Sequence, residues 1–138
     1  MLFRHGGTPY PSRWNHNIHY HGVILREIPK GARTALDVGC GNGLLTRELQ
    51  RVVPEVVGID ADERVLNQAR RDCGDVDWVP GDFLTHDFGR RFDVVASVAV
   101  LHHVPDLRAG LRRLAVLTAP GGVWRSSVWH GRRDSGTD

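Results

Sequence analysis

The sequence predicts an α/β fold: a parallel sheet of about five strands with helices on both faces. Two observations support this prediction. Short apolar runs alternate along the chain with segments of helical periodicity, and glycines or acidic residues follow several of the apolar runs. Strands that are separated by helices are joined by right-handed crossovers, so they lie parallel in one sheet. With 138 residues and 41% hydrophobic residues, the chain has the size and composition of one domain.

The strands are expected where β-branched and other apolar residues gather in short runs. Residues 92–98 are apolar almost throughout, which is typical of a central strand that is buried on both faces. The other predicted strands span residues 34–38, 55–60, 76–79 and 123–129.

The helices are expected where apolar residues recur every three or four positions. The last helix has the strongest pattern, because Asp106 can cap its N-terminus and Pro120-Gly121-Gly122 follows its end. The predicted helices span residues 15–28, 44–52, 62–72 and 106–118. Residues 14–129 therefore form the predicted domain, between a flexible arm over residues 1–13 and a disordered tail over residues 130–138.

The composition argues against several classes of function. The 18 basic residues are interleaved with 16 acidic residues and form no basic stripe, so no nucleic-acid partner is expected. No apolar run approaches the ~20 residues that a membrane-spanning helix needs. The first residues lack the pattern of a secretory leader, so we expect a cytoplasmic protein. Cys40 and Cys73 have no metal-site spacing; they are expected to be free thiols, and no bound metal is expected.

The clearest chemical signal is a glycine-rich turn after the first predicted strand. The run Leu36-Asp37-Val38-Gly39-Cys40-Gly41-Asn42-Gly43 joins that strand to a helix. Glycines allow the backbone to turn sharply and a ligand to approach it closely. The spacing G-x-G-x-G differs from the G-x-G-x-x-G of dinucleotide-binding enzymes, and no G-K-[ST] follows, which disfavours a nucleoside triphosphate site.

Acidic residues follow the next two predicted strands. Asp60 lies about 20 residues after Gly39, where a carboxylate can accept hydrogen bonds from both hydroxyls of a ribose. The alternative is a helix N-cap, a role that Asp62 can also fill. In Gly81-Asp82-Phe83, after the third strand, Asp82 could accept from an exocyclic amine while Phe83 packs on a base. A plain turn fits that tripeptide equally well.

These motifs, in this order, resemble the class I S-adenosylmethionine-dependent methyltransferases, a Rossmann-like family. Within that family they are similar to the small-molecule enzymes of the ubiquinone and menaquinone type. The resemblance covers residues 33–124 and rests on LDVGCGNG, GID, GDF, FDVVASVAVLHHVPD and LRRLAVLTAPGG. It implies S-adenosylmethionine as the cofactor and methyl transfer to a small-molecule acceptor as the reaction.

The resemblance also implies a role for each matching residue. Asp37 and Gly39 would meet the methionine end of the cofactor. Asp60 would hold the ribose hydroxyls, and Asp82 would accept from the adenine amine. The remaining implied contacts shape the turn, flank the adenine or border the methyl group: Cys40, Gly41, Gly43, Ala61, Phe83, Ser97 and Val98.

Two further groups of residues are candidates for the acceptor side of the site. His102 follows the fourth predicted strand and could act as a general base, because an imidazole titrates near pH 6.5. The alternative is a polar loop in which this imidazole bonds to the backbone. The resemblance implies a lid helix near the N-terminus, with contacts to cofactor or substrate from Trp14, Asn17, His19 and Tyr20.

The sequence departs from the family pattern after Gly122. The family continues with another helix and an antiparallel hairpin, whereas only residues 123–138 follow here. We therefore expect a truncated chain whose fifth strand is an exposed edge, through which a homodimer could form. Two alternatives to an active methyltransferase stay open. One is an inactive fragment that binds S-adenosylmethionine; the other is an NAD-dependent oxidoreductase, which the glycine spacing disfavours.

Overall fold

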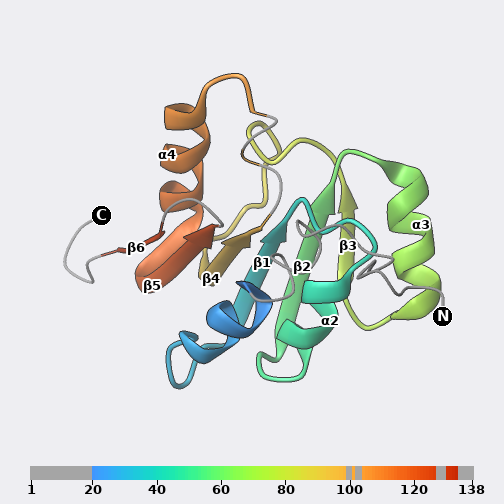
Figure 1. The fold of residues 1–138 in the computed structure, drawn as a ribbon, viewed down its shortest axis with the longest axis horizontal. Helices are drawn as coiled ribbons and strands as arrows, with labels where there is room; N and C mark the ends of the chain where they lie inside the picture. Colours follow the sequence, from blue (N-terminus) through green and yellow to red (C-terminus); the bar gives the residue numbers. More distant parts are fainter. Residues whose placement is uncertain (1–19, 99–100, 102–103, 127–129, 134–138) are drawn as a thin grey trace, which may run out of the picture.

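The computed structural model describes residues 20–98, 101, 104–126 and 130–133. The fold is built on a six-stranded sheet in the order β3-β2-β1-β4-β5-β6 (Figure 1). The strands are β1 Thr34–Val38, β2 Glu55–Asp60, β3 Asp77–Pro80, β4 Phe92–Ser97, β5 Thr118–Ser126 and β6 His130–Arg132. The helices are α2 Leu44–Gln50, α3 Glu63–Asp72 and α4 Leu107–Leu117, and residues 20–26 are also helical. The predicted α/β fold is confirmed, because β1 to β5 are parallel and only β6 is antiparallel.

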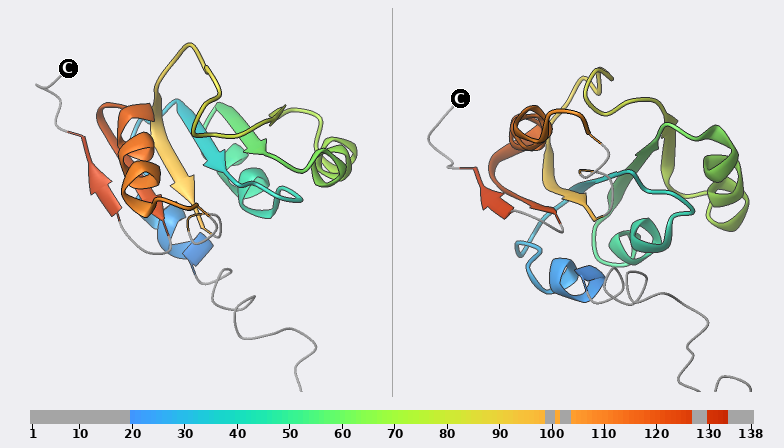
Figure 2. Two further views of the ribbon diagram at one scale, coloured as in Figure 1. Left: turned by 90° about the horizontal axis from the view of Figure 1, so that it is seen from above. Right: turned by 45° about the horizontal axis from the view of Figure 1, so that its top comes forward.

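The helices form a layer on each face of the sheet (Figure 2). Residues 20–26, α2 and α3 cover one face, where Ile24 and Leu45 belong to a buried apolar cluster. The second cluster lies on the other face and includes Leu114 of α4. In the described part of the chain, no helix combines the length and the apolar character that crossing a bilayer requires.

The strand register brings three chain segments together at one edge of the sheet. Val38 lies opposite Ile59 at the ends of β1 and β2, so the glycine-rich turn begins beside Asp60. Asp60 in turn lies opposite Pro80 at the end of β3. The order of the strands also reverses between β1 and β4, and in α/β sheets ligands bind beyond the carboxyl ends of strands at such a point.

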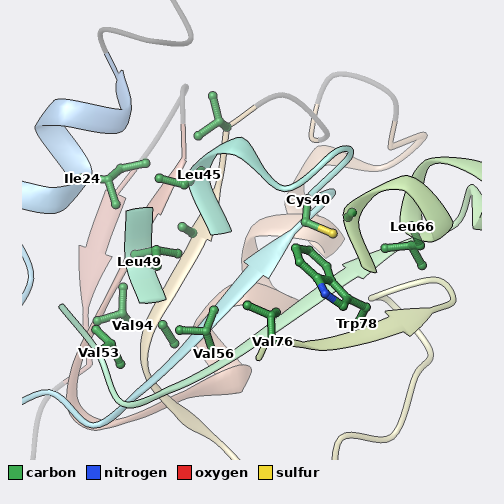
Figure 3. Packing of buried hydrophobic residues seen from close by; sticks show 14 of the residues in the cluster. Ile24, Cys40, Leu45, Leu49, Val53, Val56, Leu66, Val76, Trp78 and Val94 are labelled. Carbon is green, nitrogen blue, oxygen red and sulfur yellow. The ribbon is translucent and has the colours of Figure 1, made fainter. Parts of the chain in front are cut away.

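Trp78 of β3 packs against the glycine-rich turn from below (Figure 3). A Cβ at Gly43 would lie 2.5 Å from Trp78 Cη2, and a Cβ at Gly58 would lie 3.0 Å from Trp78 Cε3. Gly43 also has a φ of +87°, which other residues adopt only at a cost. The indole Nε1 donates to the backbone oxygen of Cys73 at 2.7 Å, which fixes the ring in place. Glycine at position 43 is thus required by both packing and backbone conformation.

Aspartates cap the two longer helices. The side chain of Asp62 accepts from the N–H of Arg64 at the start of α3. Asp106 accepts from the N–H of Ala109 at the start of α4, as its position before the apolar stripe predicts. Because Asp62 fills the capping role, the carboxylate of Asp60 does not have to.

The fifth strand begins earlier than predicted, at residue 118 and not at residue 123. α4 ends at Leu117, and β5 begins at Thr118 and runs through Pro120, Gly121 and Gly122, although these residues were expected to separate helix from strand. The register between β4 and β5 shifts between Phe92 and Val94, and this irregularity accommodates the proline. A Cβ at Gly122 would lie 2.6 Å from the backbone oxygen of Asp93, so the close approach of the two strands requires glycine there.

The tail was not expected to contain a strand, yet residues 130–132 form β6 against β5. Trp124 lies over β6, since a Cβ at Gly131 would lie 2.5 Å from the indole Cε2. Arg125 Nη1 donates to the backbone oxygen of Gly131 at 3.1 Å, and its Nε donates to Glu27 Oε2 at 2.6 Å. The predicted exposed edge at β5 is therefore covered along part of its length, and Arg125 joins this hairpin to the N-terminal segment.

The packing of Trp78 predicts unequal effects of two glycine substitutions. Gly43→Ala should lower the free energy of unfolding by roughly 2–5 kcal/mol, since it combines a left-handed φ with overpacking against the indole. Gly41→Ala is the matched control, because Gly41 has a φ of +56° but no atom within 4 Å of the added Cβ. It should cost only the backbone strain of roughly 1–2 kcal/mol. Urea unfolding curves measure both, and equal losses would contradict the packing argument.

Candidate functional site

A pocket of about 260 Å³ opens at the carboxyl ends of β1, β2 and β3. It holds five residues that the sequence analysis assigned to cofactor binding, and these come from three separate segments of the chain. They are Gly39, Asp60, Ala61, Asp82 and Phe83. The pocket is thus the place where the glycine-rich turn and the two acidic motifs meet.

Asp60 is held in one orientation by two backbone amides. The N–H of Gly41 donates to Asp60 Oδ2 at 2.9 Å, and the N–H of Asp62 donates to Oδ1 at 2.9 Å. Because each carboxylate oxygen has two lone-pair sites, one bond to each leaves both oxygens able to accept another. Asp60 can therefore present two preoriented acceptors to a ligand in the pocket.

The glycine-rich turn curls around the end of β2. The N–H groups of Gly39 and Cys40 both donate to the backbone oxygen of Ile59, at 2.8 and 3.1 Å. Gly39 has a φ of +72° and Gly41 a φ of +56°, so the turn depends on left-handed conformations that favour glycine. This curl directs the N–H of Gly41 onto the Asp60 carboxylate.

The loop after β3 forms the opposite wall of the pocket. Asp82 Oδ1 accepts from the N–H of Leu84 at 2.9 Å, and the backbone oxygen of Asp82 accepts from the N–H groups of Thr85 and His86. The side chain of Phe83 is buried and lines the pocket. Gly81-Asp82-Phe83 thus forms the turn that the sequence offered as one alternative, and Asp82 and Phe83 also line the pocket. The contact of Asp82 to an exocyclic amine stays a prediction. Asp82 Oδ2 accepts no hydrogen bond from any residue that the structure describes.

Asp37 is a buried carboxyl group at the end of β1, 3% exposed. Its Oδ2 accepts from the hydroxyl of Thr46, in α2, at 2.7 Å. Burial raises the pKa of Asp37 to about 7, the negative charge of Asp60 adds to this rise, and the bond from Thr46 opposes it. Burial, together with the charges of Asp37 and Asp60, also raises the pKa of the Cys40 thiol, so the thiol stays neutral.

Ser97 and Val98, at the end of β4, are both buried. The hydroxyl of Ser97 has no hydrogen-bond partner in the described part of the chain, which is unusual for a buried polar group. These two residues do not line the pocket. Neither do four other predicted contacts, which lie beneath or within the glycine-rich turn: Asp37, Cys40, Gly41 and Gly43.

Several predicted residues lie outside the described part of the chain, namely Trp14, Asn17, His19 and His102. Tyr20 is described, and it is half-buried against the cluster that contains Ile24. Five pocket residues were not predicted: Ile59, Gly81, Leu84, Val104 and Pro105. Three of them are adjacent in sequence to predicted residues, so their positions near strand ends could have indicated that they line the pocket: Ile59, Gly81 and Leu84. Val104 and Pro105 lie within the run FDVVASVAVLHHVPD that carries the resemblance, but no role was assigned to them, because an apolar residue before a helix usually belongs to the core.

Comparison with known proteins places the chain in a family. Residues 35–122 match the family described as the methyltransferase domain. An uncharacterized methyltransferase of Mycobacterium tuberculosis is 38% identical over 130 residues, which cover 85% of this chain and 66% of that protein. A ubiquinone biosynthesis O-methyltransferase of Coxiella burnetii is 32% identical over 110 residues, covering 72% of this chain and 44% of that protein.

Solved structures show the same fold. The S-adenosylmethionine-bound amino pentose methyltransferase CalS10 of Micromonospora echinaspora matches with a TM-score of 0.72 and 28% identity, over 86% of this chain and 52% of that one. The sugar N-methyltransferase KedS8 of a Streptoalloteichus species matches with a TM-score of 0.72 and 26% identity, over 93% and 52%. The chain thus spans about half of these structures and at most 66% of the curated relatives named above. Because the family match covers more than half of its residues, the chain belongs to the methyltransferase domain family.

Proposed function

We propose that this chain binds S-adenosylmethionine in the pocket at the ends of β1, β2 and β3, and transfers its methyl group to a small-molecule acceptor. One observation carries the proposal: the pocket places two carboxylates, Asp60 and Asp82, at neighbouring strand ends with backbone amides fixing each of them. A structural neighbour that holds S-adenosylmethionine supports the same cofactor here.

The pocket suits the adenosine half of that cofactor. The two remaining acceptor sites of Asp60 would take the ribose hydroxyl hydrogens, one on each oxygen. Asp82 Oδ2 would accept from the adenine amine, since Oδ1 is already bonded to the N–H of Leu84. Phe83, Leu84 and Val104 supply apolar walls on which a purine ring can pack.

The methionine half would extend along the glycine-rich turn toward Asp37 and the end of β4. The cofactor brings an activated sulfonium methyl group, so alignment of the acceptor is the main catalytic task, worth roughly 7–11 kcal/mol. Ser97 and Val98 would border that region from β4, and Tyr20 from the N-terminal side. A general base is needed only where the acceptor arrives protonated, and His102 stays the candidate for it.

The acceptor is proposed to be a small molecule. Two relatives support this class, since one is named as acting in ubiquinone biosynthesis and another is described as an amino pentose methyltransferase. Both proteins span more sequence than this chain, and what their descriptions share is a small-molecule acceptor.

The cellular location and the oligomeric state stay predictions. A cytoplasmic location rests on the sequence alone. A homodimer through a sheet edge would now use β3 or β6, the outer strands of the sheet, rather than β5. These strands are short, at 4 and 3 residues. Size-exclusion chromatography with light scattering measures the oligomeric state directly.

Two experiments, one after the other, test first which cofactor binds and then whether the chain transfers a methyl group. Isothermal titration calorimetry should show binding of S-adenosylmethionine and S-adenosylhomocysteine but not of NADH. Radiolabelled methyl transfer to a panel of small phenols, quinols and amino sugars then tests turnover. Binding without transfer to any of them would favour the inactive fragment, and binding of NADH alone would favour an oxidoreductase.

Asp60→Ala should weaken S-adenosylmethionine binding by roughly 1–3 kcal/mol, the loss expected when hydrogen bonds to a charged group are removed. Asp62→Ala is the matched control, since it removes the cap of α3 but no pocket wall. Calorimetric titration of both variants gives the two affinities. If Asp62→Ala weakened binding as much as Asp60→Ala, the ribose assignment would be wrong.

Cofactor affinity should rise by about 5–10-fold from pH 6 to pH 7.5, because Asp37 must lose its proton to pair with the cationic cofactor. Burial raises the pKa of this carboxyl to about 7, so below that value binding has to expel a proton. The ammonium of the cofactor keeps its proton over most of that range. Asp37→Asn cannot ionise, so its affinity should be flat over the same span. An unchanged pH profile in that variant would remove Asp37 from the proposal.

A further inference from the structure

The loop after β3 needs support from outside itself to serve as a pocket wall. Its internal bonds, from the N–H groups of residues 84–86 to Asp82, fix the shape of the turn. The N–H of Gly81 also donates to the backbone oxygen of Asp60 at 3.0 Å, which ties the start of the loop to the opposite wall formed by Asp60 and Ala61. These bonds do not tie the far end of the turn, at residues 83–86, to another element. Whatever holds residues 83–86 therefore determines how closely Phe83 and the rest of the turn approach a bound adenine.

Arg113, in the middle of α4, makes that connection. Its Nε donates to the backbone oxygen of Phe83 at 2.9 Å, and its Nη2 donates to the backbone oxygen of His86 at 2.6 Å. The guanidinium is half-buried and presents its donors in a rigid fork, so these charge-assisted bonds are directional. One side chain thus holds the turn at both ends.

The helix that carries Arg113 is firmly placed. Leu114 and Leu117 of α4 are buried in the second apolar cluster. A Cβ at Gly110 would lie 3.1 Å from Leu101 Cδ2 and 3.5 Å from Val104 Cγ1, so the helix packs closely on the segment that leads into it. Val104 is itself part of the pocket wall. α4 therefore supports the pocket on two sides, although it contributes no residue to the lining.

We propose that Arg113 is a positioning residue that sets the adenine end of the pocket by fixing the turn at residues 83–86 against α4. The inference rests on the proposed function, because the ligand whose fit it controls is the adenine of S-adenosylmethionine. Arg113 does not touch that ligand; it acts through the backbone of Phe83 and His86. Selectivity for the adenine amine should therefore depend on a side chain outside the pocket.

The test compares Arg113→Gln and Arg113→Lys with Arg112→Gln. Arg112 is exposed on the same helix and is the matched control for loss of one charge. For each variant, calorimetry gives the Kd of S-adenosylhomocysteine and of S-inosylhomocysteine, which carries a 6-oxo group in place of the amine. The ratio of the two Kd values, that of S-inosylhomocysteine over that of S-adenosylhomocysteine, should fall at least fivefold in Arg113→Gln and stay unchanged in Arg112→Gln. Arg113→Lys should fall between them, because an ammonium lacks the fork that spans two carbonyls.

A second measurement separates placement of the turn from general stability. Hydrogen exchange by mass spectrometry should show faster exchange of the amides of residues 84–86 in Arg113→Gln than in Arg112→Gln, at a temperature where circular dichroism shows both folded. If Arg113→Gln does not fold, Arg113→Lys serves in both measurements. Equal ligand preference in the Arg113 and Arg112 variants, with or without faster exchange, would overturn this inference alone. A wild-type chain that binds neither ligand would overturn the proposed function together with the inference.

Discussion

The carboxylate of Asp60 is the contact on which the site depends. It joins the end of β2 to the glycine-rich turn through the N–H of Gly41 and to the start of α3 through the N–H of Asp62. The glycine-rich turn is thereby held against the junction of β2 and α3, from which it is separate in sequence. The bonds also consume one acceptor position on each oxygen, so the remaining positions have fixed directions. A ligand that meets such a group loses less free energy to ordering the protein than one that must organise a free side chain.

A second acidic residue, Asp37, lies close to Asp60 and makes the charge of the site depend on pH. Asp37 and Asp60 lie at the ends of neighbouring strands, and Asp37 is buried whereas Asp60 reaches the pocket. Burial raises the pKa of Asp37 to about 7, so near neutrality the protein divides this carboxyl between its two charge states. A positive charge nearby favours the ionised form. The negative charges of Asp37 and Asp60 would repel an anionic group in the same region. This agrees with the absence of a G-K-[ST] phosphate motif from the sequence.

Strand bounds were predicted correctly from the sequence where local residue patterns alone determine the secondary structure. β1 and β2 have the predicted bounds, because each is an apolar run that ends in glycine or acid. The start of β5 was missed because it depends on pairing with β4, where Thr118 lies opposite Phe92. The existence of β6 was missed because residues 130–132 have no apolar run of their own and become a strand only by pairing with β5, where Gly131 lies opposite Trp124. In the site, the acidic residues after the strands were found. Val104 and Arg113 were not, because their roles come from how α4 docks, which no local pattern records.

The ion pair between Glu27 and Arg125 has a consequence for the order of folding. The two residues are 98 positions apart, yet their side chains meet at 2.6 Å. At a synthesis rate of 5–20 residues per second, roughly 5–20 s separate their appearance. Closing so long a loop costs little more entropy than closing one of half the length. The length of the loop is therefore no large thermodynamic obstacle to this ion pair. During the delay, the helical residues 20–26 can pack against α2 but have no bond to β5. Residues 20–27 are thus synthesised early, but the ion pair of Glu27 to β5 forms only after Arg125 has been made.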